Sequence, residues 1–312
     1  MESDRTPGNS STVLSGGCVD GSGEVSAYRL VRHEPSPIPI LIAVPHAGRI
    51  YTDDLRRTMR TPDETALRLE DRLVDEIGDR LAQATKASLL IADAPRAMVD
   101  LNRASDEVDW SMVKGGAQDR TIRQPVGRRV RSGLGLVPRR LPSSGEIWRG
   151  PIDSDELDRR IEAVHKPYHE ALGAELRRLR ERWGAALLID LHSMPPLSQS
   201  GEPQIVLGDR FGASCSAALS ASVVQHLQSA GLIVAQNRPY AGGYVLDRHA
   251  APRRSIHAMQ IEVCRSTYLD KGHTKIGGQA DEMVEVLAGL IQFLAGEIAA
   301  LGSATAGKLA AE

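Results

Sequence analysis

Two histidines in this sequence stand where a run of apolar residues gives way to polar ones. His46 follows the apolar run 38–45, which ends at Pro45, a residue that cannot donate a hydrogen bond to a neighbouring strand. His192 lies at the carboxyl end of the run 185–191, whose small and branched residues are typical of a strand buried on both faces of a parallel sheet. Ligands of open α/β sheets bind at this edge. Both histidines could therefore bind a metal or a substrate, or simply hydrogen-bond to a loop backbone.

A glutamate in a third apolar run is the next candidate. Glu262 lies within the predicted strand 256–265 and is set among apolar neighbours. A charged glutamate is almost never buried without a partner. A solvated strand face explains it less well, because strand alternation places Glu262 on the same face as Gln260 and Cys264. We therefore expect Glu262 to be a functional carboxylate.

Histidines at strand ends and inward-facing carboxylates suit a zinc site with three protein ligands and an open position for water, and another divalent metal could take the same ligands. Zinc lowers the pKa of bound water to about 7. A separate carboxylate is then needed to take a proton from the water and pass it to a leaving amine. The sequence contains no HExxH motif, so these residues must be brought together by the fold.

Acidic residues that could complete the site lie in the segment 61–85, which we predict to be one helix. Thr61 begins a capping-box arrangement, and apolar residues recur at helical spacing after it. Glu70 and Asp71 lie in the middle of this segment. Charged residues on a helix usually form its solvated face, but Asp71 adjoins the apolar stripe and could face inward.

Arginines at strand ends could bind a carboxylate, because the guanidinium fork pairs with both carboxylate oxygens. Arg96 follows the predicted strand 87–93, and Arg103 ends a predicted short extended segment, 98–103. Surface salt bridges are the common alternative for arginines in an arginine-rich chain.

Further strands and helices alternate along the chain, which predicts an α/β fold. We expect residues 1–24 and 303–312 to be disordered or frayed tails, and 25–302 to form one domain. Residues 104–150 are irregular and basic, so they form either a lid over an anionic substrate or a solvated loop. The other predicted strands are 204–208 and 232–235, and the other predicted helices are 154–183 (kinked or broken at Pro167), 213–229 and 277–300.

Composition narrows the function classes. The chain has 312 residues, of which 25% are charged, and a net charge of -2, so nucleic acid and an acidic membrane are not expected partners. We expect no membrane-spanning segment, because no apolar run approaches the roughly 20 residues that cross a bilayer, and the N-terminus lacks the apolar core of a signal peptide. Three cysteines without CxxC spacing suggest neither a disulfide framework nor a thiolate metal site. We expect a cytoplasmic protein.

Six short segments occur in the order found in the N-formylglutamate amidohydrolase family, which this chain resembles from about residue 41 to 270. They are Val44-Pro-His-Ala-Gly48, Asp100-Leu-Asn-Arg103, Pro167-Tyr-His169, Asp190-Leu-His-Ser193, Gly242-Gly-Tyr244 and Gln260-Ile-Glu-Val263. The resemblance implies a fold like that of zinc carboxypeptidases: three αβα layers around a mixed, mostly parallel sheet.

The resemblance also implies roles for particular residues. His46 and His192 would be zinc ligands, with Asp71 as the acidic third ligand and Glu70 as the alternative. Glu262 would be the catalytic carboxylate. Arg103 would bind the substrate carboxylate in the pocket. Weaker candidates to line that pocket are Arg265, Tyr244 and His249, and Arg96 joins them only because of its place at a strand end.

The activity implied is hydrolysis of a small N-acyl amino acid, with N-formyl-L-glutamate giving L-glutamate and formate, as in amino-acid and histidine degradation. The chain departs from members linked to histidine degradation at 66–69 and in the spacing of Arg248-His249 after Tyr244, which bears on the choice of substrate. Two alternatives stay open: a zinc peptidase or amidase acting on peptide or cell-wall amides, and a non-catalytic binding protein of the same fold. A dinucleotide-binding enzyme is disfavoured, since no GxGxxG follows the first predicted strand.

Overall fold

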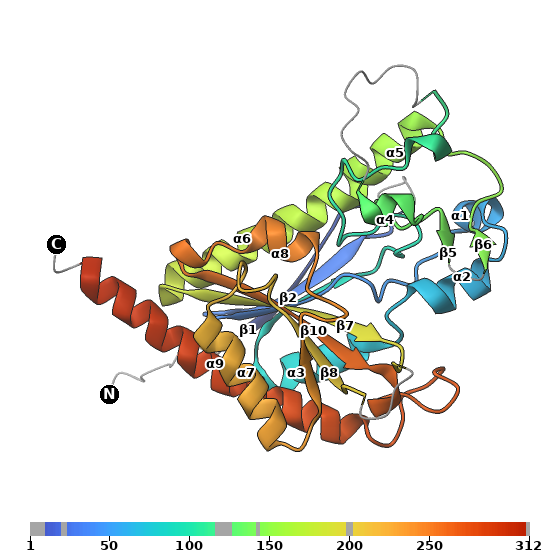
Figure 1. Cartoon of the computed structure of the whole chain (residues 1–312). Helices are drawn as coiled ribbons and strands as arrows, with labels where there is room; N and C mark the ends of the chain where they lie inside the picture. Colours follow the sequence, from blue (N-terminus) through green and yellow to red (C-terminus); the bar gives the residue numbers. More distant parts are fainter. Residues whose placement is uncertain (1–9, 20–23, 116–126, 142–143, 198–201, 310–312) are drawn as a thin grey trace, which may run out of the picture.

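The computed structural model describes residues 10–19, 24–115, 127–141, 144–197 and 202–309 (Figure 1). Within these residues one sheet of eight strands has the order β1-β2-β4-β3-β7-β10-β8-β9. Its four central strands, β4, β3, β7 and β10, are parallel, whereas β2 and β8 run antiparallel to their inner neighbours. The strands are β1 Ser10–Gly16, β2 Tyr28–Glu34, β3 Ile40–Val44, β4 Ser88–Ala92, β7 Ala186–Met194, β8 Ile205–Gly208, β9 Val234–Gln236 and β10 Ile256–Cys264.

Helices cover both faces of the sheet, so the predicted three-layer fold with a mixed, mostly parallel sheet is confirmed (Figure 1). Helices α5 (Ser154–Arg160), α6 (Lys166–Trp183) and α8 (Tyr244–His249) lie on the first face. Helices α3 (Val74–Thr85), α7 (Ala217–Ser229) and α9 (Ala280–Leu309) lie on the second. The shorter helices are α1 Asp53–Thr58, α2 Pro62–Leu69, α4 Arg128–Arg131, η1 Trp110–Met112, η3 Pro252–Arg254 and η4 Arg265–Thr267.

Apolar runs form the central strands because each strand is buried on both faces. All five residues of β3 are buried: Ile40 and Ile42 join the apolar cluster under α3 and α9, while Leu41 and Ala43 join the cluster under α6. Burial of each large aliphatic side chain contributes about 1.5–3 kcal/mol. The carboxyl ends of these strands therefore meet at a rigid edge.

The prediction of one continuous helix over 61–85 was wrong. The chain forms α2 and α3, and between them Leu73 takes a left-handed conformation with φ of 54°. In this break the backbone N–H of Asp71 donates to the carbonyl of His46 at 2.9 Å. A bond to a residue so far back in the chain replaces helical bonding, and it brings Asp71 next to the loop that follows β3.

The predicted break at Pro167 takes the form of a wide turn. Between α5 and α6, residues Ile161–His165 form a π-helical segment. Proline has no N–H, so the preceding turn can widen without losing a donor. The wide turn brings His165 and His169 to the buried side of this helical arm.

The predicted tails were wrong in part. Residues 10–16 form β1, which pairs antiparallel with β2 at the edge of the sheet. Its side chains are largely exposed, Val13 by 62%, so backbone hydrogen bonds rather than apolar content define this strand. The chain after residue 303 continues α9 to Leu309. Residues 1–9, 20–23 and 310–312 lie outside the described part of the chain.

Among the described residues, α9 is apolar and long enough over residues 280–304 to cross a membrane, contrary to our expectation for the sequence. Its buried face, which includes Leu287, Leu290 and Leu294, packs in the same apolar cluster as α3 and α7. Only 33% of the apolar window is buried, so packing against the sheet accounts for one face of this helix.

The segment predicted to be extended, 98–103, is instead a pair of turns. The described parts of the basic segment 104–150 are more ordered than expected. They contain η1, α4 and the short hairpin β5 (Arg140–Leu141) and β6 (Gly145–Glu146). Leu136 and Trp148 join the apolar cluster of the first face, which packs this segment beside the ends of the central strands.

Candidate metal centre and active-site cavity

The candidate residues meet at the carboxyl edge of the sheet because their strands are neighbours. His46 comes two residues after the end of β3, and β3 pairs with β7, which carries His192. In the parallel pair of β10 and β7, Glu262 stands directly beside His192. The strand order therefore brings three side chains together, although the first and the last of them, His46 and Glu262, are more than 200 residues apart in the sequence.

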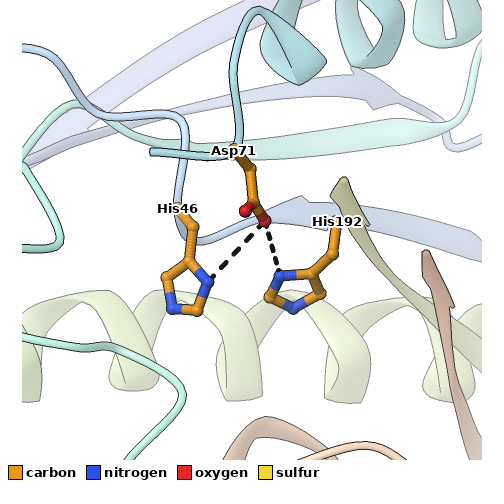
Figure 2. A group of neighbouring side chains, drawn as sticks. All are labelled: His46, Asp71 and His192. Atoms are coloured by element: carbon orange, nitrogen blue, oxygen red, sulfur yellow. Dashed lines mark hydrogen bonds and ion pairs between the residues drawn. The ribbon is translucent and has the colours of Figure 1, made fainter. Parts of the chain in front are cut away.

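Asp71 lies between the two histidines, as Figure 2 shows. Its Oδ2 is 2.8 Å from Nδ1 of His192 and 3.7 Å from Nδ1 of His46. The two imidazole rings are 4.8 Å apart between centroids. All three residues are buried, and their possible ligand atoms lie within 4.8 Å of one another.

These three residues fit a metal ion. Nδ1 of His46 is buried and has no hydrogen-bond partner among the described residues. A buried polar atom without a partner is costly in a protein interior. Two imidazole nitrogens and one carboxylate oxygen are also a ligand set of catalytic zinc sites. The cluster is thus a possible metal site formed by His46, Asp71 and His192.

Each histidine is also oriented from its far side. Nε2 of His46 donates to Oδ1 of Asp100 at 2.7 Å, and Nε2 of His192 donates to Oδ2 of Asp190 at 3.0 Å. Such carboxylates fix the ring and direct the other nitrogen to a metal. Both aspartates are buried. Sequence reasoning did not assign them this role, although Asp190 is two residues from His192 and thus on the same face of β7.

Substitution of Asp100 or Asp190 by Asn should therefore weaken metal binding. We expect a decrease of about 10–100-fold in metal affinity for either variant, because the neutral amide oxygen of Asn orients the histidine less strongly than a carboxylate does. Titration of metal-stripped protein with zinc in competition with a chelating dye measures this change. Asp106→Asn, at an exposed position, is the matched control. Affinities equal to that of the control would show that neither aspartate supports the site.

The charges of the cluster are mutually dependent. Burial alone would raise the pKa of Asp71, but the hydrogen bond from His192 and the nearby ring of His46 outweigh it and lower that pKa. Burial disfavours protonated His192, but Asp190 and Asp71 outweigh it and raise its pKa well above the usual value. A metal ligand must be deprotonated, so metal binding at this cluster would displace a proton.

Glu262 lies next to this cluster, and one of its carboxylate oxygens is hydrogen-bonded. Its Oε1 accepts a hydrogen bond from Nε2 of Gln260 at 2.7 Å, and the residue is 6% exposed. Burial raises the pKa of Glu262 to about 7, although the nearby His192 opposes the rise. A carboxylate that titrates near neutral pH is suited to accept and return a proton.

Glu70, the alternative acidic ligand, lies elsewhere. Its Oε2 is 2.5 Å from Nη1 of Arg72, and its backbone carbonyl accepts a hydrogen bond from Nη2 of Arg265 at 2.6 Å. The structure thus brings Asp71, not Glu70, to the two histidines.

A polar cavity of about 290 Å³ opens over the cluster. Three of the arginines chosen from the sequence, Arg96, Arg103 and Arg265, line it. Tyr244 and His249 are not among the described residues at its wall. Residues of the wall that sequence reasoning did not select are Asn102, Arg129, Tyr240 and Gln260.

The arginines of the cavity have different partners. Nε and Nη2 of Arg96 contact Oδ2 of Asp100, both at 2.9 Å. Nε of Arg265 donates to Oγ of Ser193 at 3.2 Å. Nε and Nη1 of Arg103 donate to the backbone carbonyls of Leu134 and Asn102 at 3.1 and 2.8 Å. Arg103 is therefore held in place without a carboxylate partner among the described residues.

Two adjacent glycines, Gly242 and Gly243, allow a close approach between segments, and a Cβ on Gly242 would lie 2.5 Å from Cδ2 of Leu246. A Cβ on Gly243 would lie 2.5 Å from Oδ1 of Asn102. This space lets Asn102 accept a hydrogen bond from the backbone N–H of Val245 at 3.0 Å. The first turn of α8 is thereby tied to the segment that carries Asp100 and Arg103.

Tyr244 and His249 belong to a buried histidine cluster behind this segment. Nδ1 of His169 and Nε2 of His249 are hydrogen-bonded at 3.0 Å, and the ring of Tyr244 stacks near His165. Nε2 of His165 donates to the carbonyl of Arg103 at 2.9 Å. The cluster therefore supports the wall of the cavity from outside it, and its residues do not face the cavity as predicted.

The chain is similar to several known proteins. The model of the family described as N-formylglutamate amidohydrolase matches residues 38–269. An N-formylglutamate deformylase from Pseudomonas putida is 31% identical over 242 residues, which cover 75% of this chain and 83% of the relative. One from Pseudomonas aeruginosa is 30% identical over 241 residues, with the same coverage.

Two solved structures extend these similarities. The crystal structure of N-formylglutamate amidohydrolase from Ralstonia eutropha JMP134 has a TM-score of 0.78 and 26% identity, and covers 88% of this chain and 99% of that one. A gene product from Agrobacterium tumefaciens has a TM-score of 0.59 and 16% identity over 86% of this chain and 96% of its own. The second likeness concerns the fold alone.

Proposed function

This chain belongs to the N-formylglutamate amidohydrolase family, and from that premise we propose that it hydrolyses N-formyl-L-glutamate to L-glutamate and formate with the help of a zinc ion. The observation that carries the proposal is the placement of Glu262 beside the His46, Asp71 and His192 cluster on the wall of one cavity. A predicted role in amino-acid degradation in the cytoplasm goes with this substrate.

The residues that would hold zinc are His46 and His192, each through Nδ1, and Asp71 through Oδ2. When bound there, zinc acts as a Lewis acid that polarises a carbonyl and lowers the pKa of water at its open position. The support for this assignment is Nδ1 of His46, which has no hydrogen-bond partner among the described residues, and the carboxylates of Asp100 and Asp190 behind the two rings.

Glu262 is the acid–base residue in this proposal. Its Oε2 accepts a proton as the oxygen of water adds to the formyl carbon, while Oε1 stays bound to Gln260. The same proton then moves to the amide nitrogen as the C–N bond breaks, so that formate and an amine leave. Because the pKa of Glu262 is raised to about 7, the same carboxyl group can accept the proton from water and donate it to the nitrogen near neutral pH.

Arg103 is the residue that binds the substrate's carboxylate. Two backbone carbonyls hold its Nε and Nη1, which leaves Nη2 for a ligand in the cavity. A guanidinium fixed in this way loses little side-chain entropy when it pairs with a carboxylate.

The size of the cavity favours a small substrate over a peptide. Its volume of about 290 Å³ lies at the low end of ligand pockets, which span about 300–1,000 Å³. A peptidase acting on extended amides would need a longer cleft along this edge.

Release of formate from N-formyl-L-glutamate is the direct test. We expect equal amounts of formate and glutamate from zinc-loaded protein, none from metal-stripped protein, and recovery when zinc is restored. Formylated dipeptides and tripeptides of graded length are the comparison. Protein that binds zinc tightly but releases no formate from any of these substrates would overturn the proposal, and preference for the longer ones would favour a peptidase.

A further inference from the structure

The wall of the cavity carries five arginines, and three of them pair with carboxylates of the protein. Arg68 pairs with Glu64 at 3.2 Å, and Arg96 pairs with Asp100 at 2.9 Å. Nη2 of Arg265 lies 3.8 Å from Oδ1 of Asp71, and Ser193 and the carbonyl of Glu70 hold the same side chain. The charges that remain for a ligand are those of the other two arginines, Arg103 and Arg129.

Arg129 differs from Arg103 in having no fixed partner. Within the described part of the chain, its guanidinium makes no hydrogen bond or ion pair, although the residue lines the cavity from α4. Partial burial lowers the pKa of Arg129, and the positive charges of Arg103 and Arg96 lower it further. Three guanidinium groups therefore lie close enough to repel one another, with Asp100 as the carboxylate that faces them.

The wall of the cavity carries charges of both signs. Two carboxylates, Asp71 and Glu262, line it together with the two histidines, and so do Arg103 and Arg129, whose guanidinium groups pair with no carboxylate among the described residues. An anion with one carboxylate can neutralise one of these two guanidinium groups. A ligand with two carboxylates can neutralise both, since each arginine pairs best with its own carboxylate.

Accordingly we propose that Arg129 is a specificity residue: it binds the side-chain carboxylate of an N-acyl acidic amino acid whose other carboxylate is bound by Arg103. This inference rests on the proposed function and assigns part of the substrate's recognition to a residue of the basic segment 104–150. The three arginines of α4 are all exposed in part, and Arg129 is the one of them that lines the cavity.

The test compares two substrates of nearly equal size, N-formyl-L-glutamate and N-formyl-L-glutamine, in wild-type and Arg129→Gln protein. We expect the substitution to lower kcat/KM for the glutamate compound by about 10–100-fold, chiefly through KM, because one charge-assisted hydrogen-bonding group is lost. The value for the glutamine compound should change less than about twofold, within the range of an ordinary surface substitution. Arg129→Lys should fall between wild type and Arg129→Gln for the glutamate compound.

Arg128→Gln is the matched control, since Arg128 is on the same short helix and exposed outside the cavity. Equal losses on both substrates, or no loss on either, would overturn the role of Arg129. A second measurement does not depend on turnover: calorimetric binding of L-glutamate and L-glutamine to zinc-loaded wild type and Arg129→Gln. If the wild type did not prefer L-glutamate, or kept its preference without Arg129, the inference would be wrong even where formate is released. If no formate is released, the proposed reaction fails, and the binding preference still decides the role of Arg129.

Discussion

Replacement of Glu262 by Gln is expected to lower kcat for N-formyl-L-glutamate by about 10²–10⁴-fold, the usual contribution of a general acid–base group. The amide of Gln has the shape of the carboxyl group but cannot accept a proton from water or carry it to the leaving nitrogen. KM should change much less than kcat, because Glu262 has no role in holding the substrate's carboxylates.

The measurement is formate release under saturating substrate, with the zinc content of each sample determined beside it. Glu285→Gln is the control, since Glu285 is exposed on α9, which packs on the opposite face of the sheet from α6 and α8. Zinc-containing Glu262→Gln protein with full turnover would refute the acid–base role. Loss of zinc together with activity would instead mean that Glu262 supports the metal site.

Replacement of Asp71 by Asn is expected to remove both metal binding and activity, whereas Glu70→Gln should keep both. The decrease in zinc affinity should exceed the about 10–100-fold effect of residues that only orient a ligand, because the anionic oxygen between the two histidines is lost. Glu70 is bound to Arg72 instead, so its amide variant should lose no more than the contribution of that ion pair to stability.

Zinc titration of the two metal-stripped variants, followed by the formate assay, compares them directly. His46→Ala should behave like the Asp71 variant, and thermal unfolding of each metal-free protein checks that the fold is retained. The assignment of the acidic ligand would be reversed if Glu70→Gln lost zinc and Asp71→Asn kept it.

The sequence by itself determined the central strands and the residues at their ends. The runs before His46 and His192 and the run around Glu262 are apolar on both faces, a pattern that a strand buried between two helical layers requires. Parallel strands of this kind present their carboxyl ends at one edge. The six short segments that resemble the N-formylglutamate amidohydrolase family occur along the chain in the order found in that family, and the comparison with known proteins confirmed the family.

The tertiary structure decided the features that depend on contacts between distant segments. Asp71 reaches the histidines because the chain leaves the helix at residues 70–73 and bonds to the carbonyl of His46, a bond that local helical spacing does not reveal. The edge strand β1 is exposed and depends on pairing with β2, so an apolar pattern could not show it. The support of His46 by Asp100 spans 54 positions.

The same reason explains the pocket residues. Arg103 follows a turn close to the sheet and was found from its motif, whereas Arg129 comes from α4 and reaches the cavity only when that segment packs over the strand ends. Tyr244 and His249 look like pocket residues in the sequence, yet α8 turns them to His165 and His169. Residue types and the strand pattern show which side chains could take part in the chemistry. The packing of distant segments decides which of these side chains face the same cavity. The reason is that the direction of a side chain depends on how its backbone is bonded to neighbouring segments.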